Sequence, residues 1–379
     1  MTGENSSCFI TLFCCPPQDY SSAVITILTQ FLGCTLLLPF IPFLKENLLR
    51  AICLHIQQDI TSDPLQSTDL PLPEVHEDSV LIKVSACGIC HTDLHIIEGD
   101  LPLRRSPIVP GHQIVGIVER IGAKVKIVKP GQRVGSPWLS STCGHCSFCK
   151  DGKENLCDNA RFTGYHLDGG YAEYVVVPEE SAYLLPGVFS DTAAAPLLCA
   201  GVIGYRALRL SEMKPGKRLG LYGFGASAHI AIQIARHRGC EVFVFTRSKH
   251  HHDLARELGA AWTGTADESP PHKLDSSVVF APAGKLVHSA LRHLEKGGTI
   301  ALAGIHMSPI PEVEYKYLYE ERTIRSVAHS THDDVRELLK VAAEIPVRTE
   351  VEEFPLADAN RALQKLKRSE IRGSGVLVV

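Results

Sequence analysis

The stretch "KRLGLYGFGASAHIAIQIARHRG" (residues 217–239) decides the fold of the second half of the chain. An apolar run is followed at once by closely spaced glycines, and then by apolar residues at helical spacing up to Gly239. This pattern predicts a buried strand, a tight turn and a helix. The turn has the spacing Gly223-x-Gly225-x-x-Ala228, whose small residues let the backbone approach a pyrophosphate at the helix N-terminus. The alternative interpretation is a helix packed closely on its strand.

Strands and helices continue to alternate on both sides of residue 260. The predicted elements are a strand at 240–246, a helix at 251–260, a strand at 276–281, a helix at 285–298 and a strand at 299–304. Strands alternating with helices of this length predict a parallel, doubly wound sheet. Two amphipathic helices and a last strand, expected to return to the first half of the chain, follow at 335–345, 357–370 and 375–379.

The first half of the chain has a different pattern. From Arg50 to about Val177, short apolar runs alternate with glycines and prolines, as in "SVLIKVSACG" (79–88) and "IVGIVERIGA" (114–123). Alternation and turn residues at this density predict an irregular, barrel-like β domain.

Length and composition set the broad class of the protein. The chain has 379 residues, which is enough for two domains, and its 45% apolar and 21% charged residues are those of a globular protein. The net charge is −4 and there is no basic block, which argues against a nucleic-acid-binding surface. Thirteen cysteines, several at Cys-x2-Cys spacing, indicate metal-bound thiolates in a reducing compartment, with the cytoplasm as the expected location.

The N-terminus contains an uncharged apolar run, residues 23–44, that is long enough to cross a bilayer. It lacks a basic segment before it, so it is a poor signal peptide, and Pro39 and Pro42 would break its last turn. Residues 1–49 are therefore interpreted as an upstream extension, with a membrane-tethered protein as the alternative.

Four cysteines share one short segment, "CGHCSFCKDGKENLC", and they are Cys143, Cys146, Cys149 and Cys157. Four soft thiolates close a tetrahedron around Zn²⁺ and leave no position for a substrate, so the segment predicts a structural zinc site. The alternatives are two disulfides or an iron–sulfur cluster.

A catalytic zinc needs fewer protein ligands, because one position must stay open. Cys90, His112 and Cys199 are the candidate ligands, and each follows a predicted strand or lies in a turn. Two thiolates and one imidazole would leave a fourth position for water or an alcohol. Taken singly, each of these residues has an ordinary structural interpretation, and a buried cysteine such as Cys199 is usually a small apolar residue.

The end of the strand 240–246 bears on the choice of nucleotide. An NAD-binding protein usually carries an acidic residue here for the ribose hydroxyls, whereas this chain has Thr246 and Arg247. A guanidinium can bind a 2′-phosphate through paired hydrogen bonds, so NADP is favoured and NAD stays possible. The nearby run of Lys249 and three histidines is interpreted as a solvated helix start.

Taken in order, these residues resemble the zinc-dependent alcohol dehydrogenases of the medium-chain dehydrogenase/reductase superfamily. The resemblance covers residues 50–379 and rests on "CGICHTDLH" (87–95), "PGHQIVG" (110–116), the four-cysteine loop, "DGGYAEY" (168–174), "LLCAGVIGY" (197–205), the glycine turn and "IRGSGVLVV" (371–379). It implies an α/β fold with a GroES-like irregular β-barrel catalytic domain, residues 50–200 and 331–379, and a Rossmann cofactor domain, residues 201–330. Residues 1–49 lie outside it.

The resemblance also implies roles for further residues. Cys90, His112 and Cys199 match the catalytic zinc ligands and the four clustered cysteines match the structural ones. Around the catalytic zinc, Thr92 matches a hydroxyl that hydrogen-bonds the alcohol, Asp93 a carboxylate that orients the ligand histidine, and His95 a distal base that passes the proton to solvent. Trp138 matches a wall of the substrate pocket, Arg372 matches a pyrophosphate contact, and Cys87 has no assigned role.

Two positions depart from the family pattern. Gln113 replaces the glutamate that commonly follows the ligand histidine, which would leave the metal slightly more electrophilic. Ala228 replaces the third fingerprint glycine, a tolerated change.

The function expected from these residues is the interconversion of primary or secondary alcohols with aldehydes or ketones by hydride transfer to a nicotinamide cofactor, with two zinc ions per chain. The expected partner is a small-molecule substrate, and family analogy favours a homodimer or homotetramer. The alternative from another class is a non-catalytic redox sensor that binds zinc and nucleotide.

Overall fold

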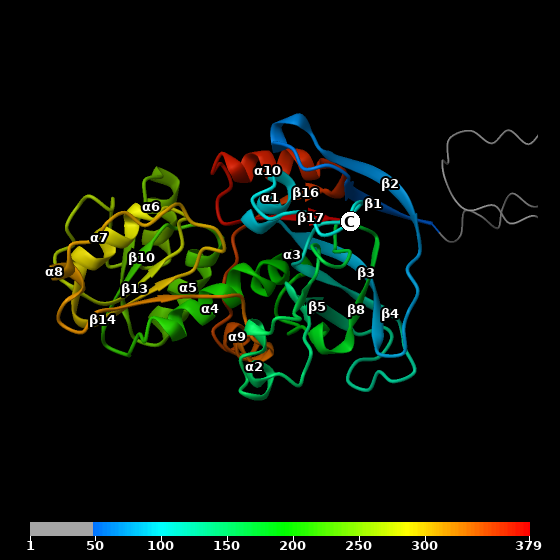
Figure 1. The fold of residues 1–379 in the computed structure, drawn as a ribbon, viewed down its shortest axis with the longest axis horizontal. Coiled ribbons are helices and arrows are strands. Elements are labelled where there is room, and N and C mark those ends of the chain that lie inside the picture. The colour runs from blue at the N-terminus through cyan, green and yellow to red at the C-terminus, as the bar shows by residue number, and fades with distance from the viewer. Residues whose placement is uncertain (1–47) are drawn as a thin grey trace, which may run out of the picture. The chain divides into compact units, whose positions relative to one another are not determined.

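The computed structural model describes residues 48–379, and the apolar run 23–44 lies outside these residues. A six-stranded sheet and a seven-stranded sheet organise the described part of the chain, together with two small two-stranded sheets. Figure 1 shows the two large sheets on either side of α4 (Ala200–Leu210).

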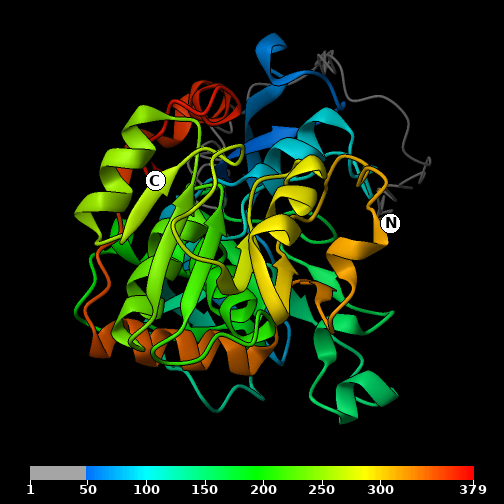
Figure 2. The ribbon, with the colours of Figure 1, turned by 90° about the vertical axis from the view of Figure 1, so that its left-hand side faces the viewer.

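The six-stranded sheet is parallel throughout, and Figure 2 shows its strands running alongside one another. Its strands are β10 (Arg218–Tyr222), β11 (Glu241–Phe245), β12 (Trp262–Gly264), β13 (Leu274–Val279), β14 (Leu294–Leu302) and β15 (Thr323–Ser326). They lie in the order β12-β11-β10-β13-β14-β15. The direction of progress reverses between β10 and β13, and such a switch point opens a crevice at the carboxyl ends of the strands. The predicted Rossmann sheet is therefore confirmed.

The helices that accompany this sheet are α5 (Ala226–His237), α6 (Lys249–Glu257), α7 (Lys285–His293) and α8 (Tyr315–Leu318). The prediction of one helix over 285–298 is wrong at its C-terminal end. Helix α7 stops at His293 because Leu294 pairs with Leu274 as the first residue of β14, and both side chains are fully buried there. Burial in the sheet outweighs the helical spacing of the sequence.

The seven-stranded sheet is antiparallel except for one pair. Its strands are β3 (Ser79–Gly88), β4 (Ile114–Ile121), β5 (Arg133–Ser136), β8 (Tyr174–Pro178), β9 (Tyr183–Leu184), β16 (Val351–Pro355) and β17 (Ser374–Val378). The small sheets pair β1 (Leu48–Leu54) with β2 (Leu65–Pro71), and β6 (Leu139–Ser141) with β7 (Arg161–Phe162). The short helices here are α1 (His91–Glu98), α2 (Ser147–Lys150) and α3 (Asp191–Ala194), with 3-10 turns at Ile60–Ser62, Glu154–Leu156, Glu179–Ser181, Ala195–Leu198 and Leu356–Asp358.

The C-terminal segment returns to this antiparallel sheet. After α9 (His332–Glu344), the parallel pair β16 and β17 is separated by α10 (Ala359–Lys367). Strand β17 then pairs with β3, and Leu377 lies opposite Cys87. The last strand thus supports the strand that leads into "CGICHTDLH".

One apolar core connects the two large sheets. It includes Val115 from β4, Leu198 from the turn before α4, and Leu219 from β10, all fully buried. Helix α4 packs closely on α5 at Gly204, where an added Cβ would lie 3.0 Å from the carbonyl oxygen of Ser227. The absence of a side chain at Gly204 therefore permits the close approach of the two helices.

Within residues 48–379, no single helix has the length and apolar composition needed to cross a membrane, although the bent pair Asp191–Leu198 and Ala200–Leu210 passes that test on length and composition alone.

Candidate functional site

Cys90 occupies the N-cap of α1, directly after β3 ends at Gly88. Its backbone is extended, and its Sγ accepts a hydrogen bond of 3.2 Å from the backbone N–H of Thr92. The Asp93 carboxylate completes the capping box by accepting from the Cys90 N–H at 2.9 Å. The local sequence therefore holds the sulfur at a fixed position at the start of the helix.

His112 is fully buried in the segment that leads into β4. Its Nδ1 lies 3.1 Å from Oδ1 of Asp93, and the Tyr171 hydroxyl donates to Oδ2 of the same carboxylate at 3.0 Å. With Nδ1 directed at Asp93, the other ring nitrogen, Nε2, is buried and has no hydrogen-bond partner among the described residues. A buried, unpaired nitrogen of this kind is the atom through which histidine binds a metal.

Cys199 comes from a third segment, at the N-terminus of α4. Its Sγ lies 3.9 Å from Sγ of Cys90, and one ligand atom each from Cys90, His112 and Cys199 lie within 4.8 Å of one another. A disulfide would hold the sulfurs about 2.05 Å apart, whereas two sulfurs at about 2.3 Å on a tetrahedral zinc ion lie about 3.8 Å apart. The donor set and its spacing therefore fit a zinc ion with three protein ligands.

The charges at this centre favour a thiolate on Cys90. A hydrogen bond from the Cys199 thiol holds the pKa of Cys90 well below its ordinary value, and the charge of His112 adds to this effect against the opposing effect of burial. By contrast, burial raises the pKa of the neighbouring Cys87 thiol far above its ordinary value. Cys87 therefore stays protonated, and the structure places it in the core of the antiparallel sheet.

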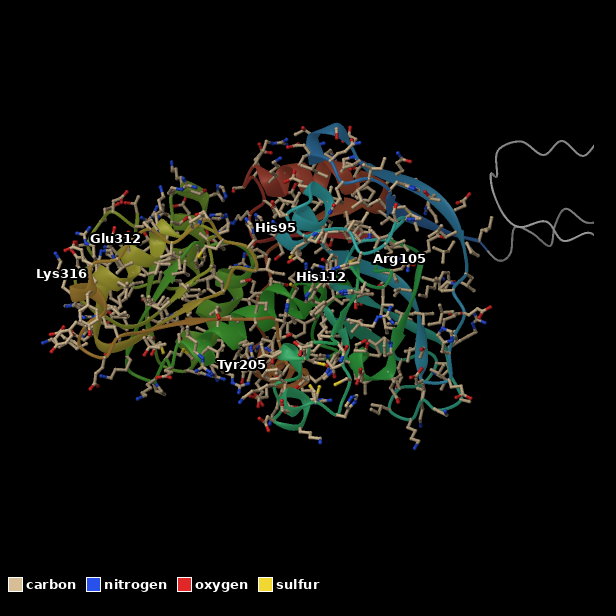
Figure 3. The ribbon with its side chains drawn as sticks, in the orientation of Figure 1. His95, Arg105, His112, Tyr205, Glu312 and Lys316 are labelled. Carbon is tan, nitrogen blue, oxygen red and sulfur yellow. The ribbon has the colours of Figure 1, made fainter. Side chains whose placement is uncertain are left out.

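Two of the relay residues predicted from the sequence lie on α1 beside Cys90. Thr92 is buried, and His95 lies one turn further along the helix with its side chain 13% exposed. Figure 3 labels His95 and His112 in the same region of the fold.

The Trp138 ring packs against the His112 ring. The two rings meet edge to face with their centroids 4.8 Å apart, and the indole stacks on Phe162 at 5.0 Å. His329, which precedes α9, contacts the same Phe162 ring at 4.6 Å. An aromatic wall of Trp138, Phe162 and His329 thus adjoins His112, and the family resemblance implied only Trp138.

The four-cysteine loop forms a second centre around α2. Its four ligand atoms lie within 4.8 Å of one another, with Sγ–Sγ separations of 3.9 Å for Cys143–Cys149 and 3.5 Å for Cys146–Cys149. Backbone N–H groups of His145 and Cys146 lower the pKa of the Cys143 thiol to about 6. These separations exclude disulfides between those pairs, and the four convergent sulfurs fit a closed tetrahedral zinc site.

The glycine turn lies where β10 ends and α5 begins. Gly223 has φ +90°, and a Cβ there would lie 2.9 Å from the backbone nitrogen of Ala281, so only glycine fits without strain. A Cβ on Gly225 would meet nothing within 4 Å, which leaves open space in front of the N-terminus of α5. Ala228 is buried beneath this turn. The turn therefore has the room and the helix dipole that a pyrophosphate needs.

Thr246 and Arg247 follow β11 at the same edge of the sheet. Thr246 is buried, whereas Arg247 is exposed and forms no ion pair within residues 48–379. Arg372 is different, because its guanidinium pairs with Glu257 of α6. The sequence prediction of Arg372 as a pyrophosphate contact did not anticipate this ion pair.

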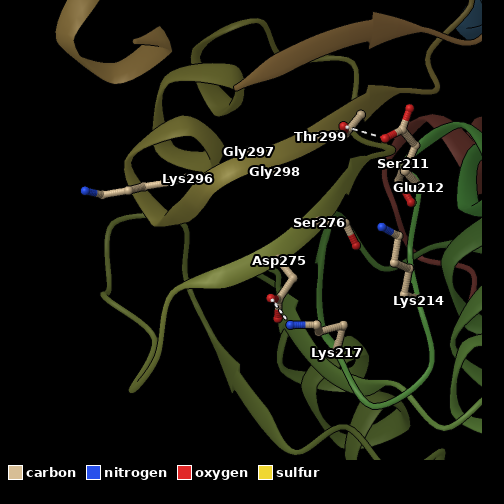
Figure 4. A pocket seen from close by; sticks show the side chains of 10 residues that line it. All are labelled: Ser211, Glu212, Lys214, Lys217, Asp275, Ser276, Lys296, Gly297, Gly298 and Thr299. Carbon is tan, nitrogen blue, oxygen red and sulfur yellow. Dashed lines mark hydrogen bonds and ion pairs between the residues drawn. The ribbon is translucent and has the colours of Figure 1, made fainter. Parts of the chain in front are cut away.

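A hollow of about 190 Å³ opens at the opposite, amino-terminal edge of β10, β13 and β14 (Figure 4). Its charged lining includes Lys217, which pairs with Asp275 at 3.4 Å. Neither cysteine nor histidine lines it. The two thiol centres and the glycine turn therefore lie elsewhere.

Comparisons with known proteins agree with this geometry. A family model described as "Alcohol dehydrogenase GroES-like domain" matches residues 76–187, and one described as "Zinc-binding dehydrogenase" matches residues 228–344. A probable alcohol dehydrogenase, AdhA, from Mycobacterium tuberculosis (strain CDC 1551 / Oshkosh) is 46% identical over 322 residues, which cover 83% of this chain and 93% of that protein.

Solved structures are similar over most of the chain. An acetophenone reductase from Geotrichum candidum in complex with NAD has a TM-score of 0.80 at 25% identity, covering 88% of this chain and 98% of that one. A CAD from Helicobacter pylori complexed with NADP(H) has a TM-score of 0.79 at 25% identity, with the same two coverages.

Proposed function

The chain belongs to the zinc-dependent alcohol dehydrogenases of the medium-chain dehydrogenase/reductase superfamily, and from this premise we propose that Cys90, His112 and Cys199 hold its catalytic zinc ion. It is an NAD(P)-dependent oxidoreductase of alcohols and aldehydes, so a hydride passes between the substrate carbon and the nicotinamide while a proton is exchanged with solvent. The redox sensor considered from the sequence has no counterpart in the relatives described above.

The observation that carries the proposal is the convergence of two thiols and one imidazole from three separate segments, with no fourth protein ligand in their group. When bound there, zinc supplies Lewis-acid chemistry, which makes an alcohol more acidic and polarises a carbonyl. Asp93 faces Nδ1 of His112, so Nε2 is the ring nitrogen that would bind the ion.

We assign the proton transfer to residues of α1. Thr92 is buried beside Cys90 and donates its backbone N–H to the Cys90 sulfur. We assign to its hydroxyl the proton of the alcohol, which His95 takes towards solvent. The aromatic wall around Trp138 excludes water from one side of His112 and favours small or flat substrates. The substrates that we propose are primary alcohols and aldehydes, with secondary alcohols and ketones as a second group.

We assign a structural zinc ion to Cys143, Cys146, Cys149 and Cys157. All four sulfurs converge on one loop, and no fifth side chain or open position is needed. Two zinc ions per chain are therefore proposed, one at each group of ligands.

We propose NADP as the preferred cofactor, bound at the carboxyl edge of the parallel sheet. The turn of Gly223, Gly225 and Ala228 receives the pyrophosphate. The exposed Arg247, which forms no ion pair within the part of the chain that the structure describes, receives the 2′-phosphate beside Thr246. Because Arg372 is held by Glu257, it reaches the pyrophosphate only if this exposed ion pair opens.

The sheets support the proposed division into a catalytic domain, residues 50–200 and 331–379, and a cofactor domain, residues 201–330. All six parallel strands lie between Arg218 and Ser326, and β16 and β17 belong to the antiparallel sheet. We further propose a homodimer or homotetramer. Within the described residues, strand β15 pairs with β14 on one side, and its other side is a free edge of the sheet. The segment before it exposes four large apolar or aromatic side chains, those of Ile305, Ile310, Tyr315 and Tyr319.

A panel of primary and secondary alcohols, assayed with NADP⁺ and NAD⁺, tests the proposal together with Cys90→Ser. We expect the wild type to oxidise members of the panel, and we expect Cys90→Ser to lose turnover while it still binds nucleotide, because the glycine turn is untouched. Nucleotide binding is measured by quenching of tryptophan fluorescence. Cys87→Ala is the matched control and should keep activity. Equal loss of turnover and nucleotide binding in Cys90→Ser would instead show that Cys90 supports folding.

A further inference from the structure

A second hollow, of about 380 Å³, lies between the loop that leads into β13 and the C-terminal end of α7. Residues 269–273 line it from the loop, Arg292 and His293 line it from the helix, and Tyr317 of α8 completes the lining. The hollow adjoins the start of β13, whereas the glycine turn follows the end of β10. It is therefore separate from the proposed nucleotide site.

The lining of this hollow is cationic. Lys273 and Arg292 are joined there by the basic side chains of His272 and His293, and no acidic side chain lines it. Lys273 and Arg292 are exposed and form no ion pair within residues 48–379, although the Lys273 ammonium donates to the Arg292 carbonyl. Cations at the C-terminus of α7 also complement the helix dipole, which accounts for their charge but not for the further donor in the hollow.

That donor is the imidazole of His293, which is only 6% exposed. Its Nδ1 lies 2.9 Å from the hydroxyl of the fully buried Tyr222, and this is the only hydrogen bond of that hydroxyl within the described residues. The hydroxyl therefore donates its proton to Nδ1, because the proton would otherwise be buried without a partner.

The second nitrogen of His293 then carries the ring proton. Burial and the charges of Lys273 and Arg292 lower the pKa of His293 to about 4, so the ring is neutral at pH 7 and has a single N–H. With Nδ1 accepting from Tyr222, this N–H is on Nε2, which has no hydrogen-bond partner in the part of the chain that the structure describes. A buried imidazole thus offers an unused donor beside two unpaired cations.

We propose that this hollow binds the phosphate group of a small molecule, to which Lys273 and Arg292 supply charge and Nε2–H of His293 supplies a hydrogen bond. A guanidinium binds phosphate oxygens through paired, charge-assisted hydrogen bonds. Pro270, Pro271 and Tyr317 add apolar surface beside the cations, which suits the carbon skeleton of a phosphate monoester. The smaller hollow of Figure 4 lacks this preference, because Glu212 and Asp275 are part of its lining.

Isothermal titration calorimetry with inorganic phosphate tests this inference on the zinc-loaded, full-length chain. Ionic strength is held constant, and excess NADP⁺ keeps phosphate out of the nucleotide site. We expect the wild type to bind phosphate, and we expect Arg292→Gln to weaken binding about tenfold, because the charge-assisted hydrogen bonds are lost. Lys285→Gln is the matched control and should bind as the wild type does, since Lys285 is an exposed cation at the other end of α7.

His293→Phe tests the buried donor. It removes the N–H but keeps an aromatic ring to stack on Phe245, whose centroid lies 5.3 Å from that of His293. We expect weaker phosphate binding in this variant, provided that its circular dichroism spectrum matches that of the wild type. If the variant does not fold, the exposed Arg292→Gln substitution decides the question alone.

A repeat of the titration with glycerol 3-phosphate distinguishes the two sources of a phosphate group. Tighter binding than that of inorganic phosphate would assign a phosphate monoester to the hollow, and equal binding would assign the free ion. Three results would overturn the inference: no phosphate binding by the wild type, unchanged affinity in Arg292→Gln, or an equal loss in Lys285→Gln, which would indicate general attraction between charges. None of these results bears on alcohol oxidation, so the inference and the proposed function fail independently.

Discussion

Asp93 is fully buried, yet its carboxylate contacts polar groups from three segments of the chain. It accepts from the Cys90 N–H and from the Tyr171 hydroxyl, and it faces Nδ1 of His112. One side chain therefore positions two of the three proposed ligands. The resemblance to zinc-dependent alcohol dehydrogenases implied its role towards His112. The contact with Tyr171 depends on the folding of distant segments, which local spacing does not encode.

Asp93→Asn should weaken the catalytic zinc site selectively. An asparagine amide has only one oxygen, so it cannot face Nδ1 of His112 and also accept from the Cys90 N–H and the Tyr171 hydroxyl. The His112 ring therefore loses its fixed orientation. We expect zinc affinity at this site to fall about 10- to 100-fold, as is typical when such a partner is removed. Competition with a chromophoric chelator measures this, and the four-cysteine site serves as the internal reference. Unchanged affinity at the catalytic site would contradict the role of Asp93.

Arg247→Ala tests the preference for NADP. Removing the guanidinium deletes the proposed partner of the 2′-phosphate, so KM for NADP should rise about tenfold or more while KM for NAD changes little. Steady-state kinetics with both cofactors measure the two values, and Arg238→Ala, at the far end of α5, is the control. An unaltered ratio of the two KM values would remove the case for 2′-phosphate recognition.

At the scale of elements, α4 and α9 are joined by a buried charge cluster. Asp334 in the first turn of α9 is fully buried and pairs with Arg206 and Arg209 of α4. The same carboxylate accepts from the N–H and the hydroxyl of Thr331, both at 2.9 Å, and so caps α9. Because Cys199 is the N-cap of α4, this cluster also fixes the helix next to the third proposed ligand.

Asp334→Asn should destabilise the fold strongly, because it leaves Arg206 without its counter-charge and Arg209 with Glu337 alone. Removing one partner of a buried ion pair lowers the free energy of unfolding by about 3 kcal/mol. Removing one partner of an exposed ion pair lowers it by less than about 1 kcal/mol. Asp333→Asn is therefore the matched control, since the Asp333 side chain is 76% exposed and, within residues 48–379, pairs only with Arg336. Urea unfolding of both variants measures the difference. Equal stability of the two variants would show that the cluster contributes nothing.

Element positions were predictable where burial and local pattern agree. Strand β3 spans Ser79–Gly88 as predicted, because its apolar run is buried along nearly its whole length. The start of β14 was not predictable, since the pairing of Leu294 with Leu274 depends on a distant strand. The contact between Oδ2 of Asp100 and Nδ1 of His95, at 2.7 Å, was not predictable for a similar reason. It requires the reversal of the chain after α1, where Gly99 has φ +94°.

At the scale of the whole molecule, the order of motifs was enough to predict the pairing of a Rossmann sheet with an antiparallel zinc-binding half. The aromatic wall could not be predicted, because Trp138, Phe162 and His329 come from segments far apart in the sequence. The same holds for the contact between His306 and His95, which joins the segment after β14 to α1. Contacts between the halves depend on their packing, which no local pattern encodes.

The zinc content of the purified chain, measured by inductively coupled plasma mass spectrometry after dialysis, tests the central claim most directly. The two groups of ligands predict two zinc ions in the wild type and one in Cys90→Ser, which keeps its four-cysteine site. One zinc ion in an active wild type, or two ions retained by Cys90→Ser, would contradict the assignment of Cys90, His112 and Cys199 to a catalytic zinc ion.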